Sequence, residues 1–80
     1  MQIESLRVFC DLAESRSFTN AARINQITQS AVSQQISSLE RHFDTLLIER
    51  SKKMFRLTKE GQLLYDHSKE IINTFETLTS

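Results

Sequence analysis

The sequence predicts a mostly α-helical fold, in which three short helices are followed by a two-stranded hairpin and a long last helix. The chain of 80 residues contains one glycine and no proline, so few residues interrupt helices. Apolar side chains recur at helical spacing in four segments, and two short apolar runs flank a basic turn between the third and fourth segments. This length suits one small domain.

The first two helices are predicted to lie close together. The first runs from about residue 2 to residue 14, and its apolar residues are Ile3, Leu6, Phe9, Cys10, Leu12 and Ala13. Those at positions 3, 6, 10 and 13 form one stripe, with Phe9 beside it. Ser17 is predicted to cap a short second helix, whose apolar contacts are Phe18, Ala21, Ala22 and Ile24. The adjacent alanines permit close approach by another helix, as two helices joined by a tight turn require.

The third helix is predicted to begin after Thr28 as its cap, to run from Gln29 to Phe43 and to end at Asp44. Its apolar stripe is Val32, Ile36, Leu39 and Phe43. No charged residue occurs between Ile24 and Leu39. A solvated helix face usually carries Lys and Glu, so a face of Gln and Ser favours a surface that meets hydrogen-bonding groups.

The two apolar runs at 46–48 and 55–57 predict a hairpin around a turn at 51–53. Residues 50–59 hold five basic side chains and no acidic one, whereas the whole chain has ten of each and zero net charge. The zero net charge by itself argues against a nucleic-acid partner, but a segregated basic patch favours one.

The last helix is predicted to begin after Thr58 as its cap and to run to about Thr79. Leu64, Ile71 and Leu78 lie seven residues apart, with Phe75 beside them, and this spacing favours pairing with another helix. Packing of this stripe against its own domain is the alternative. In the pairing interpretation, intradomain packing is left to Leu63 and Tyr65.

This order of elements is that of a winged helix-turn-helix, with the helix-turn-helix at about 18–37 and the wing at about 46–57. The major groove accepts an α-helix and presents donors and acceptors to Gln and Ser side chains. Base contacts are therefore predicted for Gln29, Ser30, Ser33 and Gln34. Contacts with the DNA backbone are predicted for Thr19, Thr28, Ser37, Arg50, Lys52, Lys53 and Arg56.

At this level of detail the chain resembles the N-terminal domain of LysR-type transcriptional regulators. The resemblance rests on residues 6–9, 17–19, 21–22, 31–33, 35–36, 39–40, 49–50 and 56–58, with Gln29 and Gly61. It covers essentially the whole chain without a gap. No single match is diagnostic, but together they are highly specific.

The resemblance implies a bacterial DNA-binding domain at 1–58 and a linker and dimerisation helix at 59–80. Homodimers, and tetramers at full length, would then bind an interrupted inverted repeat in double-stranded DNA. The dimerisation residues would be Leu64, Ile71, Phe75 and Leu78. A C-terminal domain that binds a small-molecule inducer would lie outside this chain, and no cofactor is expected within it.

Four positions depart from the family pattern. Ser30 stands where Pro is common, and Gln34 stands where Arg is common, which removes a charge that would reach phosphate or base. Asp44 and the turn near Lys52 stand where Gly is common, which costs backbone freedom.

Other functions are less well supported by the sequence. We expect no enzyme, because no phosphate loop, metal-ligand cluster or catalytic triad pattern occurs. Cys10 is expected in the core, His42 in solvent, and His67 in packing rather than in a pH-dependent contact. The absence of a long apolar run and of a leader pattern favours a soluble cytoplasmic protein, associated with the nucleoid and not with a membrane. The main alternative is a helical protein–protein adaptor, which the zero net charge favours.

Overall fold

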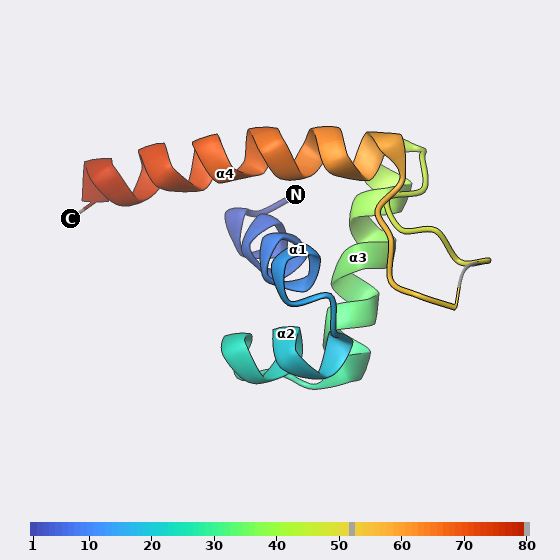
Figure 1. Cartoon of the computed structure of the whole chain (residues 1–80). Coiled ribbons are helices and arrows are strands. Elements are labelled where there is room, and N and C mark those ends of the chain that lie inside the picture. Colours follow the sequence, from blue (N-terminus) through green and yellow to red (C-terminus); the bar gives the residue numbers. More distant parts are fainter. Residues whose placement is uncertain (52, 80) are drawn as a thin grey trace.

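The computed structural model of the chain describes residues 1–51 and 53–79. It contains four helices within those residues: α1 (Ile3–Ser15), α2 (Phe18–Asn25), α3 (Gln29–Phe43) and α4 (Lys59–Thr79). The first three helices form a compact body, α4 crosses it, and the loop between α3 and α4 projects to one side (Figure 1). The predicted mostly helical architecture is confirmed.

The ends of the helices follow the predicted chemistry. Ser17, Thr28 and Thr58 each accept a backbone N–H bond through their side-chain oxygens, from Asn20, Ala31 and Gly61 respectively. The first three helices end on residues in the left-handed conformation, which are Arg16, Gln26 and Asp44 at φ of 58°, 56° and 53°. The prediction that Asp44 ends α3 in this conformation is confirmed.

The core lies among α1, α2, α3 and the start of the wing. Its fully enclosed large side chains include Phe9, Leu12, Ile36, Leu39 and Leu47. Ala21 and Ala22 are buried, as the close approach of helices requires. Burying these apolar side chains supplies most of the free energy that favours this small fold.

Two predicted apolar contacts are wrong. Ile24 is 58% exposed, because α2 turns that side toward solvent, and Phe43 at the end of α3 is 41% exposed. Helical periodicity identifies a stripe, but it does not show where a neighbouring helix stops covering that stripe. α1 also extends one residue beyond its predicted end.

The predicted wing is present as one antiparallel bridge between Ile48 and Leu57. Two backbone hydrogen bonds flank this bridge, from Glu49 N–H to the Arg56 carbonyl at 2.9 Å and from Thr58 N–H to the Leu47 carbonyl at 3.0 Å. The paired segments are those the apolar runs indicated. Their pairing fixes the base of the loop and leads directly into α4.

α4 packs through one stripe and exposes another. Gly61 and Ser68 are buried against the body, and the side chains beside them that contact the core are Leu64, Tyr65 and Ile72. Leu63 is 59% exposed, so the prediction that it packs within the domain is wrong, whereas Tyr65 does pack there. Small residues at 61 and 68 allow the helix backbone to approach the body closely.

Candidate nucleic-acid interface

The outer face of α3 is polar, uncharged and open. Gln29, Ser30, Ser33 and Gln34, the four residues predicted to contact bases, are all exposed, and Ser37 is half-buried. Val32, Ile36 and Leu39 on the opposite face are buried and fix the helix to the body. The structure therefore brings the four residues together on one rigid, accessible surface that can donate and accept hydrogen bonds.

The turn between α2 and α3 positions the start of this face. The Gln29 side-chain amide donates to the Thr19 hydroxyl over 2.9 Å, which joins the first turn of α3 to the first turn of α2. Ile27 N–H donates to the Ala22 carbonyl at 3.0 Å within the turn. Thr19 and Thr28 are both exposed, at the same end of the helix pair as Gln29. Thr28 also caps α3, so a contact with phosphate would use its hydroxyl proton.

Glu40 holds the wing against α3. One of its carboxylate oxygens accepts the Leu47 N–H at 2.9 Å, and the other accepts the Arg50 guanidinium at 2.7 Å. The Glu40 side chain is only 10% exposed, whereas that of Arg50 is 47% exposed. Arg50 was predicted as a phosphate contact. Its positive charge is partly neutralised by Glu40, so less of it is available to a phosphate.

The other predicted wing cations differ from Arg50. Lys53 and Arg56 are exposed, whereas the predicted contact at Lys52 lies outside the described residues. Arg16, at the junction of α1 and α2, was not predicted, yet its guanidinium donates to the Phe55 carbonyl at 2.8 Å. The sequence indicates a role for Arg16 only in that it is a basic residue in the break between two predicted helices.

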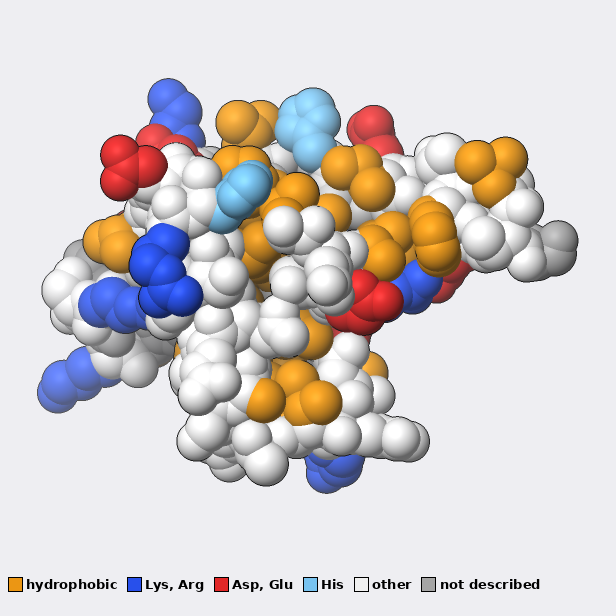
Figure 2. All heavy atoms as spheres, turned by 180° about the vertical axis from the view of Figure 1, so that it is seen from behind, with side chains coloured by type: hydrophobic (Ala, Val, Ile, Leu, Met, Phe, Trp, Pro, Cys, Tyr) orange, Lys and Arg blue, Asp and Glu red, His pale blue; other side chains and the backbone are white. Residues whose placement is uncertain are grey.

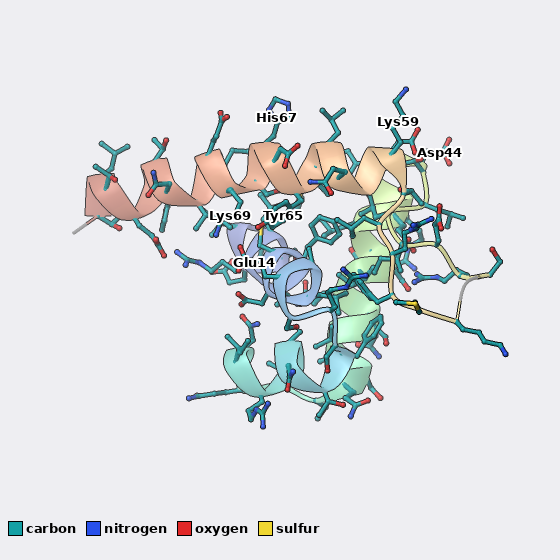
Figure 3. The ribbon with its side chains drawn as sticks, in the orientation of Figure 1. Glu14, Asp44, Lys59, Tyr65, His67 and Lys69 are labelled. Atoms are coloured by element: carbon teal, nitrogen blue, oxygen red, sulfur yellow. The ribbon has the colours of Figure 1, made fainter. Side chains whose placement is uncertain are left out.

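A separate polar cluster joins α1 to α4 (Figure 3). The Glu14 carboxylate accepts the Tyr65 hydroxyl at 2.7 Å and pairs with Lys69 at 2.8 Å. These two hydrogen bonds lower the pKa of Glu14, that from Lys69 most, while the hydrogen bond to Glu14 raises the pKa of both Tyr65 and Lys69. The cluster links α1 to the middle of α4, whereas His67 points away from it on the opposite side of α4.

Cys10 is buried in the core, as predicted. Burial raises the pKa of its thiol to about 11, so the thiol stays protonated at neutral pH. Among residues 1–51 and 53–79, no group of three His, Cys, Asp or Glu side chains is placed to hold a metal ion. No helix in the same part of the chain is long and apolar enough to span a membrane.

The exposed stripe of α4 forms an apolar surface on the face of the molecule that Figure 2 shows, which is the back in Figure 1. Its members are Leu63, Ile71, Phe75 and Leu78. Near the start of α4 the stripe meets a groove of about 340 Å³ lined by Phe43, Leu47, Leu63, Leu64 and His67, among others. Figure 2 shows hydrophobic side chains gathered in a band along this face, with the two histidines beside it. Of the four predicted dimerisation residues, Leu64 also packs against the core.

Comparison with known proteins gives a consistent result. The family described as "Bacterial regulatory helix-turn-helix protein, lysR family" matches residues 3–62. The regulator CysL of Bacillus subtilis is 37% identical over 76 residues, which cover 95% of this chain and 25% of CysL. The regulator CatR of Pseudomonas putida is 43% identical over 68 residues, which cover 85% of this chain and 23% of CatR. The chain thus spans about a quarter of the length of these relatives.

Solved structures show the same fold bound to DNA. The BenM DNA-binding domain in a complex with catB site 1 DNA is 30% identical, with a TM-score of 0.93 over 99% of this chain and 89% of that one. DarR of Vibrio fischeri in complex with DNA is also 30% identical, with a TM-score of 0.89 over 96% of this chain and 26% of DarR.

Proposed function

Because the chain belongs to the lysR family of bacterial regulatory helix-turn-helix proteins, we propose that it recognises operator DNA by placing the first half of α3 in the major groove. Its family and its relatives are transcription regulators rather than enzymes. The observation that carries the proposal is the exposed, charge-free face of Gln29, Ser30, Ser33 and Gln34 on a helix whose other side is buried.

Base recognition is assigned to this face. Gln can make paired hydrogen bonds with adenine, and Ser can donate to or accept from several bases. The bond from Gln29 to Thr19 limits the conformations of the Gln29 amide before DNA arrives, which lowers the entropy cost of a base contact. Thr19, Thr28 and Ser37 border the face and are assigned to the DNA backbone.

The wing supplies charge. Lys53 and Arg56 are exposed and are assigned, with Lys52, to backbone phosphates. Arg50 is assigned a smaller share of phosphate binding, because Glu40 already neutralises part of its charge. This arrangement gives affinity to the wing and sequence preference to α3.

α4 is assigned to pairing. We extend the predicted dimerisation stripe of Leu64, Ile71, Phe75 and Leu78 to include Leu63, which is exposed on the same side and lines the adjoining groove. Two copies joined through this stripe would present two α3 helices to an interrupted inverted repeat. Such a dimer would act on chromosomal DNA in the nucleoid, and the inducer would bind a domain beyond this chain.

Selection of duplexes from a random library at moderate salt tests the proposal. Enrichment of an interrupted palindrome would support both specific recognition and pairing. Enrichment of a single half-site would support recognition and contradict pairing by this chain alone. If the folded chain enriches no sequence, DNA recognition is contradicted and the adaptor alternative gains weight.

Two single substitutions test the assignment within α3. Gln29→Ala and Ser33→Ala should each relax the selected sequence at one position of the half-site, with a loss of discrimination of about 1–3 kcal/mol. Binding to random DNA should stay nearly unchanged, because the phosphate contacts remain. An unchanged sequence preference in both variants would move base recognition away from these residues.

A further inference from the structure

The wing and the α1–α2 junction together enclose a positively charged hollow. Its volume is about 300 Å³, and it is lined by Arg16, Lys53, Met54, Phe55 and Arg56. Three of these five residues are cations, and none of the described residues lining the hollow is acidic. The hollow therefore combines side chains from two distant parts of the sequence into one site that attracts anions.

Arg16 is held in this position by the backbone. It lies in the left-handed region at φ 58°, directly after α1, where the chain turns into α2. Its guanidinium bonds to the carbonyl of Phe55, a neutral group, so its positive charge is retained. The structure records no ion pair for Arg16 within residues 1–51 and 53–79, in contrast to Arg50, which pairs with Glu40. A guanidinium has five N–H donors, so one bond to a carbonyl leaves others available.

The position of Arg16 relative to α3 matters as much as its charge. Arg16 immediately precedes Ser17 and the first turn of α2, and that turn is joined to the start of α3 by the bond from Gln29 to Thr19. On its other side, Arg16 is bonded to the wing. It thus lies between the first turn of α2 and the basic side chains of the wing.

A neighbouring hollow lacks this character. It is also bordered by Arg16 and Lys53, but Glu49 lines it, and one Glu49 carboxylate oxygen is buried without a hydrogen-bond partner in the described residues. A carboxylate there disfavours an anion. This second hollow has Arg50 in place of Arg56, but Arg50 is already paired with Glu40. The added acid and the paired arginine favour the hollow lined by Arg16, Lys53 and Arg56 as the anion site.

We infer that this hollow binds one backbone phosphate of operator DNA, with Arg16 as a phosphate contact alongside Lys53 and Arg56. The inference rests on the proposed function, since it names a further contact of the same DNA interface. The strand of DNA that passes the first turn of α2 then continues over Arg16 to the wing. In this chain Arg16 also supplies positive charge to an interface in which position 34 is an uncharged Gln.

A matched pair of substitutions tests the inference. Arg16→Gln keeps a side-chain N–H donor for the Phe55 carbonyl but removes the charge, whereas Arg16→Lys keeps the charge. Binding of each variant and of the wild-type chain to one duplex, preselected with the wild type, is measured between 50 and 200 mM salt. Arg16→Gln should weaken binding about tenfold. The negative slope of log K against log salt should become shallower by about 0.9. Arg16→Lys should retain the wild-type slope.

The outcomes separate the two proposals. If Arg16→Gln matches the wild type, or if Arg16→Lys loses as much slope as Arg16→Gln, the charge of Arg16 does not contact phosphate and the inference is overturned. If the wild-type chain itself binds no duplex in a salt-dependent way, the proposed function fails instead.

A third variant separates a loss of DNA contact from a loss of folding. Arg16→Gly removes the whole side chain, but glycine adopts φ 58° without strain, so the melting temperature should not fall. DNA binding should weaken as in Arg16→Gln. Scanning the duplex with single neutral methylphosphonates should then locate one phosphate whose replacement weakens the wild type more than Arg16→Gly. Equal effects on both proteins at every position would overturn the inference.

Discussion

At the scale of single residues, three of those that the structure describes adopt left-handed backbone conformations, which cost L-residues about 1–2 kcal/mol each. Asp44 is one of them, and it is exposed at the end of α3. Asp44→Gly should raise the free energy of unfolding by about 0.5–1 kcal/mol, because glycine relieves the strain but loses more entropy on folding. Urea denaturation measures this change. A fall in stability would mean that the Asp44 side chain makes a contact worth more than the strain.

Glu14 links stability to pH at the same scale. Its pKa is lowered in the folded chain by hydrogen bonds from Lys69 and Tyr65, so its contribution is present above the unfolded value near 4.5. That contribution is lost as the pH falls through the lowered pKa. Glu14→Gln should therefore be less stable than the wild type at pH 6, and the difference should shrink as the pH falls below 4.5. Unfolding curves at several pH values measure the difference.

Glu70→Gln is the matched control for Glu14. Glu70 is an exposed carboxyl on α4, next in sequence to Lys69. Its substitution removes a carboxylate that makes none of the cluster's hydrogen bonds, so at pH 6 this variant should be about as stable as the wild type. If the stability of Glu14→Gln depends on pH in the same way as that of the wild type, the hydrogen bonds of Glu14 do not contribute to the pH dependence of stability.

At the scale of elements, the close contact between α4 and the wing depends on Gly61, which has no side chain. A Cβ atom added at Gly61 would lie 2.0 Å from the Leu47 carbonyl oxygen, an atom that also accepts the Thr58 N–H. Backbone atoms cannot move away cheaply, so Gly61→Ala should destabilise the chain by about 2–4 kcal/mol even though alanine favours helix. Chemical denaturation measures the loss. Gln62→Ala, at an exposed neighbour, should be nearly neutral, and equal effects of both would contradict the close packing.

How far the elements follow from the sequence depends on whether local or tertiary forces decide them. α3 has its predicted bounds because Thr28 and Asp44 supply local chemistry at its ends. Ile24 and Leu63 were placed wrongly because their exposure depends on where another helix docks, which periodicity does not contain. In the candidate site, exposure of the Gln and Ser face was predictable. The ion pair of Arg50 with Glu40 and the position of Arg16 were not, since both depend on how the wing folds back.

At the scale of the whole molecule, the proposed DNA-binding and pairing surfaces use different sides of different helices. α3 presents its polar face and the wing its cations, while α4 carries the exposed apolar stripe. Another side of α4 packs on the body through Leu64, Tyr65 and Ile72, and the ion pairs Glu14–Lys69 and Arg7–Glu76 join it to α1. Because α4 is anchored in this way, pairing through the stripe would also set the distance and angle between two α3 helices.

Ile71 lies near the middle of the exposed stripe and is 49% exposed, so a charge there should disrupt pairing without unfolding the monomer. We expect Ile71→Glu to shift the chain from dimer to monomer in sedimentation equilibrium, because a carboxylate buried in an apolar interface loses its hydration. Asn73→Glu, exposed on another side of the same helix, should keep the wild-type mass. On DNA, Ile71→Glu should bind one half-site as the wild type does but lose the added affinity for two correctly spaced half-sites. If all three proteins are dimers at micromolar concentration, pairing uses a surface other than this stripe. If the wild type itself is a monomer, pairing by this chain alone is contradicted.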